Sequence, residues 1–280
     1  MLQDWYHTPV FEVWFTERQT PPVPGDNGLI NGKNKFNASG KITGSYSEFK
    51  FQKGKKYRMR IINSSTDQHF KFSIDQHEMT VQAADFIAVK PYTQEVLNIA
   101  IGTHPYKIRC KKKLMMVGQR YDVIFEAKEE VGNYWMRAVP ATDCSAQLNP
   151  NGIRAIVRYV GSNPISEPTS TPFPITSTEC VDETGLVPVV PRDVGKFAYG
   201  NEEDVGVVVD KYIKFTINNS SLFIDWENPT LLMVEDHDPK YPRDYNVVQL
   251  NGTSETVFIS LYELISSGLT SLFNLLVLSS

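Results

Sequence analysis

Tyr57-Arg-Met-Arg-Ile-Ile62 and His69-Phe-Lys-Phe-Ser-Ile74 alternate polar and apolar residues with a period of two. That period indicates half-buried β-strands, because successive side chains of a strand point to opposite faces of a sheet. Further short apolar runs follow at close intervals, separated by turn residues. They lie at 29–32, 79–84, 95–101, 121–126, 134–139 and 153–160. Eight or so short strands in succession predict a β-sandwich or a barrel.

The composition is that of a folded, acidic protein. The chain has 280 residues, of which 41% are hydrophobic and 21% are charged. This content supports a sizeable core in one large domain or two ordinary ones. The net charge is −4, and we therefore expect no nucleic-acid partner, since such partners are bound by basic surfaces.

Three features divide the chain. A proline–glycine turn cluster at 20–28 marks a boundary before the strand-rich region. The stretch 161–200 is rich in Pro, Ser and Thr and is predicted to be a linker on the outside of the sandwich. Strand-like runs at 205–209 and 212–217 begin a second β unit, which stops within roughly 60 residues, short of the about 100 that a sandwich needs.

The tail 256–280 is rich in Leu and Ser. Its apolar runs are shorter than the about 20 residues of a membrane span, so we expect no membrane span there. An amphipathic helix is equally compatible with this tail.

No motif for metal-dependent or nucleophilic catalysis is present. The five histidines include no His-X-His pair and no pair at the helical i, i+4 spacing that binds zinc. His69 and His77 could approach each other across neighbouring strands, but two imidazoles without a third ligand are more often structural residues. A blue-copper centre needs a Cys thiolate with two His around it, and the spacing here offers none. Gly-X-Ser-X-Gly and His-Glu-X-X-His are also absent.

Sequons and cysteines indicate an oxidising compartment. Five Asn-X-Ser/Thr sites favour a secreted glycoprotein. They are Asn37, Asn63, Asn218, Asn219 and Asn251. In that compartment Cys144 and Cys180 would form a disulfide that staples the linker to the sandwich, leaving Cys110 as an odd thiol. The first residues have no basic start, apolar stretch or cleavage site of a signal peptide, so we expect that the front of the protein is missing.

Asp67 is the one acidic residue with a candidate role. It lies in Asn63-Ser-Ser-Thr-Asp-Gln-His69, between two strand-like runs, and we expect it to project from an exposed loop. The structural alternative is a turn aspartate that bonds to its own backbone, which is the usual role of Asp in such loops. The residue types alone favour that alternative.

Four motifs then stand in order along the chain: Asp26-Asn-Gly-Leu-Ile-Asn-Gly32, Tyr57-Arg-Met-Arg-Ile-Ile-Asn-Ser-Ser-Thr66, His77-Glu-Met-Thr-Val-Gln-Ala-Ala-Asp85 and Gly118-Gln-Arg-Tyr-Asp-Val-Ile124. They resemble the second cupredoxin domain of a fungal laccase, a multicopper oxidase, and Leu148-Asn-Pro150 extends the likeness. The resemblance covers most of residues 1–255. It implies an all-β fold: a cupredoxin-like Greek-key β-sandwich plus an incomplete second cupredoxin-like unit.

The resemblance also implies a domain order. Residues 1–18, with Asp4-Trp-Tyr-His7, resemble the exit of the family's first cupredoxin domain. The cupredoxin domain proper would occupy 19–160, the linker 161–200, the start of the third domain 201–255 and a divergent tail 256–280. An atypical insert at 103–118 interrupts the domain, and its removal leaves a net charge of −9. Our hypothesis is a retained in-frame intron, with the tail a read-through into non-coding sequence.

Such oxidases are secreted glycoproteins that oxidise phenols and aromatic amines one electron at a time, with O2 as the acceptor. Their copper is held by His-X-His and His-Cys-His motifs, which this chain lacks. The resemblance therefore implies the non-copper middle domain, with no copper bound and no activity alone. By that likeness Asp67 hydrogen-bonds the phenol and accepts its proton, and Pro22 lines the same pocket. The alternative is a secreted, non-catalytic β-sandwich glycoprotein that binds an aromatic ligand or a partner chain.

Overall fold

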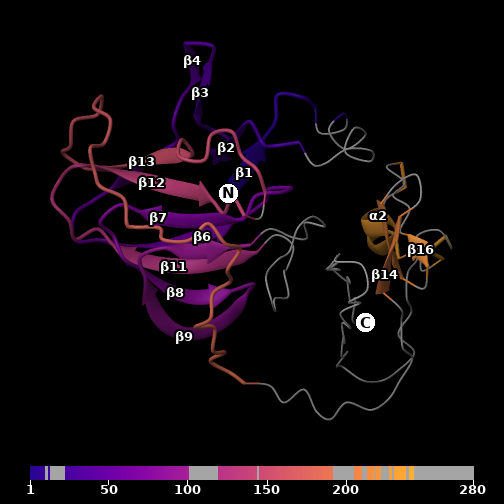
Figure 1. Ribbon diagram of the computed structural model, residues 1–280. Helices are drawn as coiled ribbons and strands as arrows, with labels where there is room; N and C mark the ends of the chain where they lie inside the picture. Colours follow the sequence, from indigo (N-terminus) through magenta and orange to yellow (C-terminus); the bar gives the residue numbers. More distant parts are fainter. Residues whose placement is uncertain are drawn as a thin grey trace.

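Two facing β-sheets form the body of the protein, as Figure 1 shows. The computed structural model describes residues 1–9, 12, 23–100, 119–143, 145–191, 205–209, 213–217, 219–221, 227–228, 230–237 and 240–242. One sheet has the strand order β10-β7-β12-β13-β5 and the other the order β6-β11-β8-β9. In Figure 1 the labelled strands of the first sheet lie above those of the second. The prediction of an all-β sandwich is confirmed.

The four-stranded sheet follows directly from the alternating pattern. β6 (Lys56–Ile62) and β11 (Arg120–Glu126) are antiparallel, and Tyr121, Val123 and Phe125 stand opposite Ile61, Met59 and Tyr57. These apolar residues share the inner face, while Lys56, Arg58 and Arg60 point outward. β8 (Met79–Ala84) pairs with β11, and β9 (Ile87–Gln94) pairs with β8. Cross-strand apolar pairs of this kind fix the register, because a slip of one residue would move every side chain to the other face.

The five-stranded sheet closes the core from the other side. Its central strands are β7 (Phe70–Ile74), β12 (Asn133–Pro140) and β13 (Arg154–Tyr159), with β10 (Leu97–Ile99) and β5 (Glu48–Phe51) at the edges. β5 runs parallel to β13, whereas the other pairs are antiparallel. Every residue of β7 is buried, and β7 lies between β10 and β12 in the sheet. The core is continuous between the two sheets.

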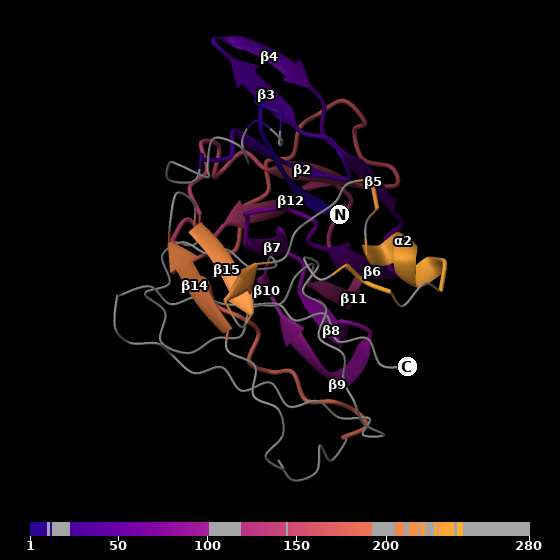
Figure 2. The same cartoon turned by 90° about the vertical axis from the view of Figure 1, so that its right-hand side faces the viewer.

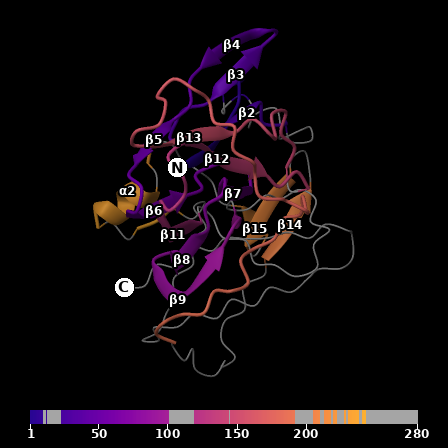
Figure 3. The same cartoon turned by 90° about the vertical axis from the view of Figure 1, so that its left-hand side faces the viewer.

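Smaller elements frame the sandwich. β1 (Leu2–Trp5) pairs with β2 (Asn27–Ile30). β3 (Lys35–Ala38) and β4 (Lys41–Gly44) form a hairpin that stands at one end of the sandwich in Figures 2 and 3. β14 (Val205–Val209), β15 (Ile213–Ile217) and β16 (Ser220–Ser221) form a separate small sheet, and α2 (Thr230–Glu235) is a short helix. No helix among the described residues has the length and apolar character needed to cross a membrane.

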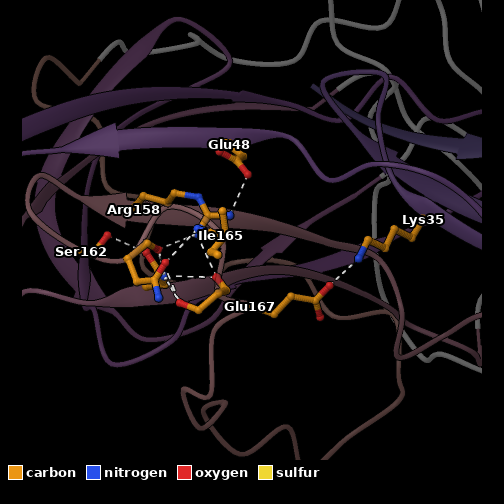
Figure 4. Close-up of polar contacts among 9 residues, drawn as sticks. Lys35, Glu48, Arg158, Ser162, Ile165 and Glu167 are labelled. Carbon is orange, nitrogen blue, oxygen red and sulfur yellow. Dashed lines mark hydrogen bonds and ion pairs between the residues drawn. The ribbon is translucent and has the colours of Figure 1, made fainter.

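The predicted linker packs on the sandwich at several points. Arg158 donates to the carbonyl of Ser166 at 2.9 Å and to Glu48 at 2.7 Å, and Lys35 forms an ion pair with Glu167 (Figure 4). Farther along, the backbone of 187–189 pairs with the outer edge of β9. This pairing covers part of an edge strand that would otherwise expose unpaired backbone groups.

Candidate functional site: the loop that carries Asp67

The loop between β6 and β7 closes on itself through its own side chains. Asn63 is fully buried, and its Nδ2 donates to the carbonyls of Gln68 at 2.9 Å and Ile99 at 3.1 Å. Its Oδ1 accepts the N–H of Ser65 at 3.1 Å, and the Ser65 hydroxyl donates to the Gln68 carbonyl at 2.7 Å. Asn and Ser are suited to this role, because their short polar side chains replace backbone partners in turns.

Asp4 on β1 holds the loop from one side. Its two carboxylate oxygens accept the N–H of Thr66 at 3.0 and 2.9 Å, and Oδ2 also accepts the N–H of Asp67 at 2.7 Å. Burial raises the pKa of the Asp4 carboxyl, and the hydrogen bond from Thr66 partly opposes that rise. A carboxylate that accepts backbone N–H groups forms stronger hydrogen bonds than a neutral acceptor does.

The segment 145–149 holds the loop from the opposite side. The Ser145 hydroxyl donates to the carbonyl of Asp67 at 2.7 Å, and Gln68 Nε2 donates to the carbonyl of Ala146 at 3.2 Å. The N–H of Gly25 also donates to the Ala146 carbonyl, at 3.1 Å. A Cβ at Gly25 would come within 2.8 Å of Gln147 Nε2, so glycine is what permits this close approach.

Asn27 joins two of the motifs noted in the sequence. Its Oδ1 accepts Nδ2 of Asn149 and Nδ2 of Asn34, both at 2.9 Å, and its carbonyl accepts Nε2 of Gln147 at 3.1 Å. Asn27-Gly28 and Leu148-Asn149 are therefore in contact although about 120 residues separate them. Three other parts of the chain thus meet around the loop 63–69: β1, 25–28 and 145–149.

The placement of Asp67 differs from the sequence expectation. We expected an exposed loop residue, but Asp67 is only 7% exposed. Asp4, Asn63 and Ser145 supply the capping bonds of this loop, and their long-range arrangement cannot be recognised from neighbouring residues. Pro22 lies outside the described residues, so its place relative to Asp67 stays a prediction.

Both ring nitrogens of His77 form hydrogen bonds within the sandwich. Nδ1 of His77 bonds to the carbonyl of Asp75 at 2.8 Å, and Nε2 bonds to the Tyr159 hydroxyl at 2.6 Å. Both ring nitrogens of this buried residue are therefore occupied, which does not fit a metal ligand. Among the described residues, no three His, Cys, Asp or Glu side chains gather in a way that could hold a metal ion. The prediction that this chain binds no copper remains a prediction.

The described residues include only some of the predicted disulfide and glycosylation sites. Cys180 is disulfide-bonded, and the N–H of Asp143 donates to the carbonyl of Thr178 at 3.2 Å. That contact brings the segment before Cys144 beside the segment before Cys180, but Cys144 itself lies outside the described residues. Asn218 and Asn251 also lie outside them.

Of the other three sequons, two are accessible. Asn37 on β3 and Asn219 between β15 and β16 are exposed. Asn63 has no exposed surface, and its Nδ2, the atom that a glycan would occupy, donates two hydrogen bonds. A glycan at Asn63 therefore does not fit the folded protein, and the prediction for that residue is corrected.

Comparisons with known proteins find a family model and relatives that match most of this chain. The family model described as "Multicopper oxidase" matches residues 1–105 and 110–162. Laccase-2 of Botryotinia fuckeliana is 39% identical over 260 residues, which cover 90% of this chain and 42% of that protein. Laccase-1 of the same fungus is 35% identical over 264 residues and covers 90% of this chain and 41% of that protein. The chain thus spans about two fifths of the length of these relatives.

Solved structures give the same result. The laccase from Botrytis aclada superposes with a TM-score of 0.71 at 38% identity, covering 88% of this chain and 44% of that one. Fet3p, a multicopper oxidase that functions in iron import, has a TM-score of 0.52 at 20% identity over 85% of this chain and 42% of that one, a likeness of fold alone. The expectation of a cupredoxin-like fold is confirmed, and the non-catalytic alternative is not favoured. The chain belongs to the multicopper oxidase family, and fungal laccases are the relatives that it resembles over most of its length.

Proposed function

We propose that this chain is the middle portion of a laccase-like oxidase, which couples one-electron oxidation of phenols and aromatic amines to the reduction of O2 to water. The observation that carries the proposal is the family match, which runs through the whole sandwich from residue 1 to residue 162 with one short break at 106–109. In this proposal the sandwich braces the first and third domains. Copper, held by the first and third domains and not by this chain, would accept the electrons.

Asp67 is the proposed contribution of this chain to the substrate pocket. Its loop is fixed on two sides, by Asp4 and by Ser145, so the residue is held on a supported loop rather than a loose one. A carboxylate there can accept the phenolic proton, and loss of that proton makes the ring easier to oxidise. Pro22 would line the same pocket.

The proposed domain order is the one expected from the sequence. Residues 1–18 would be the exit of the first cupredoxin domain, 19–160 the second domain, 161–200 the linker, 201–255 the start of the third domain and 256–280 a divergent tail. We also propose secretion, a Cys144–Cys180 disulfide, and glycans at the sequons other than Asn63. The disulfide proposal is supported by the oxidised state of Cys180.

Binding of a phenol tests the substrate role. We expect guaiacol to shift the NMR signals of Thr66, Asp67 and Gln68 in the purified chain, and Asp67→Asn to weaken the affinity about tenfold, because a hydrogen bond to a charged group is lost. Asp85→Asn is the matched control: Asp85 also accepts a backbone N–H, that of Arg120 at 3.0 Å, but on the β8–β9 turn. An affinity that is the same for the unsubstituted chain and Asp67→Asn would refute the role of Asp67.

Metal analysis tests the assignment of copper to other domains. The purified chain should contain less than stoichiometric copper and show no blue absorption band, since the blue centre needs a Cys thiolate and two His. Tightly held copper together with turnover of guaiacol would overturn the proposal that this chain is a non-copper middle portion.

A further inference from the structure

Two backbone N–H groups of the loop 63–69 are hydrogen-bonded by a residue outside the loop. The side chains of Asn63 and Ser65 satisfy the N–H of Ser65 and the carbonyl of Gln68. The N–H groups of Thr66 and Asp67 point away from these bonds and meet the carboxylate of Asp4. These two N–H groups belong to Asp67, which carries the candidate base, and to the residue before it, so whatever holds them fixes the backbone from which the Asp67 side chain projects.

Asp4 is itself rigidly placed. It stands opposite Gly28 in the β1–β2 ladder, and a Cβ at Gly28 would come within 2.5 Å of Ile153, so β2 packs closely on the sandwich. β1 also touches the loop directly, because the N–H of Ser64 donates to the carbonyl of Leu2 at 2.9 Å and Leu2 forms a parallel bridge with Asn63. A carboxylate on a strand can hold a loop more firmly than one on another loop.

We propose that Asp4 is a positioning residue: its carboxylate fixes the backbone of Thr66 and Asp67 and thereby aims the Asp67 carboxylate into the substrate pocket. This inference rests on the proposed function of Asp67. In this proposal β1 is connected to the loop 63–69, so that a displacement of β1 would be transmitted to Asp67 through the three hydrogen bonds of Asp4.

The chemistry of the contact predicts which substitutions matter. Asn in place of Asp4 has the same shape, but it carries one acceptor oxygen where two are used and presents an N–H2 donor to backbone N–H groups. Glu keeps the charge but places it one methylene farther from β1. A purely electrostatic role would therefore be rescued by Glu, whereas a positioning role would be rescued only in part.

Hydrogen exchange of the full chain is the first test. We expect Asp4→Asn to lower the exchange protection of the Thr66 and Asp67 amides about tenfold, with the amides of Val81 and Val123 unchanged, because a hydrogen bond to a charged group has that weight. The three-bond Hα–Hβ couplings of Asp67 should move toward rotamer-averaged values. Asp4→Glu should restore protection partly, and Asp85→Asn should leave both readouts at loop 63–69 as they were. Unchanged protection or unchanged couplings in Asp4→Asn would overturn the proposal.

A double-mutant cycle measured with guaiacol tests whether Asp4 acts on substrate binding through Asp67. If it does, Asp4→Asn and Asp67→Asn each lower the affinity for guaiacol about tenfold, and the double variant binds guaiacol no more weakly than either single variant. Additive losses would overturn the positioning role, while leaving the role of Asp67 intact. No binding of guaiacol to the unsubstituted chain would refute the proposed function instead, and exchange and couplings would then still decide whether Asp4 orients Asp67.

Discussion

The backbone N–H of Ala100 donates a 2.7 Å hydrogen bond to Oε1 of Gln119. The backbone carbonyl of Gln119 in turn accepts the N–H of Asn63 at 3.1 Å. Ala100 and Gln119 are the residues on either side of 101–118, which lie outside the described residues. A bond of this type requires the two Cα atoms to lie within roughly 9 Å of each other, and a chain of three residue steps reaches about 10 Å. A direct connection through Ile101 and Gly102 could therefore close the sandwich.

Deletion of residues 103–118 should leave the sandwich folded. Because a shorter loop loses less entropy when its ends are brought together, and the connection shortens from 18 residues to two, we expect the free energy of unfolding to rise by about 2 kcal/mol. Urea denaturation followed by tryptophan fluorescence measures this difference. A chain in which a Gly-Ser segment of equal length replaces 103–118 is the control, and it should match the unmodified chain.

The retained-intron hypothesis can be separated from this stability effect. A deletion variant that fails to fold would show that 103–118 contributes to the sandwich, and the hypothesis would lose its structural support. Sequencing of the spliced transcript decides the origin of the segment, since a mature message that encodes 103–118 contradicts an intron.

Strong alternation made the central strands predictable. The run at 57–62 and the run at 121–126 appear as β6 and β11 within one residue at each end, because each has an apolar face that only a sandwich interior can bury. β3, β4, β5 and β9 were not predicted. Their exposed positions carry mostly polar residues and Pro, and such strands form because a neighbour offers its edge, not because their own sequence demands it.

The candidate site was predictable only in part. Asp67 was singled out through the resemblance, but its burial follows from Asp4 and Ser145, which lie 63 and 78 residues away. Asp4 lies in the Asp4-Trp-Tyr-His7 motif, but nothing in that motif indicates a contact with the loop 63–69. Contacts of such long range leave no local pattern, so sequence periodicity could not have indicated them. The error at Asn63 has the same origin, since a sequon does not report burial.

Arg137 and Asp75 form a buried ion pair whose loss should be costly. Nε and Nη2 of Arg137 lie 2.7 and 2.8 Å from the two carboxylate oxygens of Asp75, whose side chain has no exposed surface. Arg137→Met leaves that carboxylate with the Ser170 hydroxyl at 2.7 Å but without its countercharge, and we expect a loss of about 3–5 kcal/mol in unfolding free energy.

Exposed Arg58, which pairs with Asp122, supplies the control for this prediction. Arg58→Met should cost under about 1 kcal/mol, because water screens an exposed pair. Chemical denaturation of both variants makes the comparison. Equal losses in the two would mean that the Arg137–Asp75 pair is not the buried support that its geometry indicates.

His77 should make stability depend on pH. Burial lowers the pKa of His77 below its ordinary value, so the unfolded chain binds a proton at a higher pH than the folded chain does. The stability is therefore fully present above the unfolded pKa of about 6.5 and falls as the pH drops below it, with a slope of at most about 1.4 kcal/mol per pH unit for one proton. Protonation would also turn Nε2 into a donor toward the Tyr159 hydroxyl.

Urea unfolding between pH 7 and pH 5 measures this slope. His77→Gln should be less stable at pH 7, because the bonds to Asp75 and Tyr159 change, but its stability should decline less as the pH falls. A slope that survives in His77→Gln would assign the pH dependence to another group.

Glycosylation should distinguish Asn37 from Asn63 in a chain fused to a secretion signal and produced in yeast. Asn37 is an exposed residue of the β3–β4 hairpin, and its Oδ1, not its Nδ2, accepts the N–H of Gly40 at 2.8 Å. We expect Asn37→Gln to remove one glycan, seen as a smaller mass loss on endoglycosidase treatment, with an unfolding free energy within about 0.5 kcal/mol of the parent. Asn63→Gln should leave the glycan mass unchanged but lower the stability by about 2 kcal/mol or more, because the carbonyls of Gln68 and Ile99 lose a buried donor. Loss of a glycan in Asn63→Gln would mean that the yeast oligosaccharyltransferase modifies Asn63 before the loop folds. The two hydrogen bonds from Asn63 Nδ2 could not then form as the structure has them.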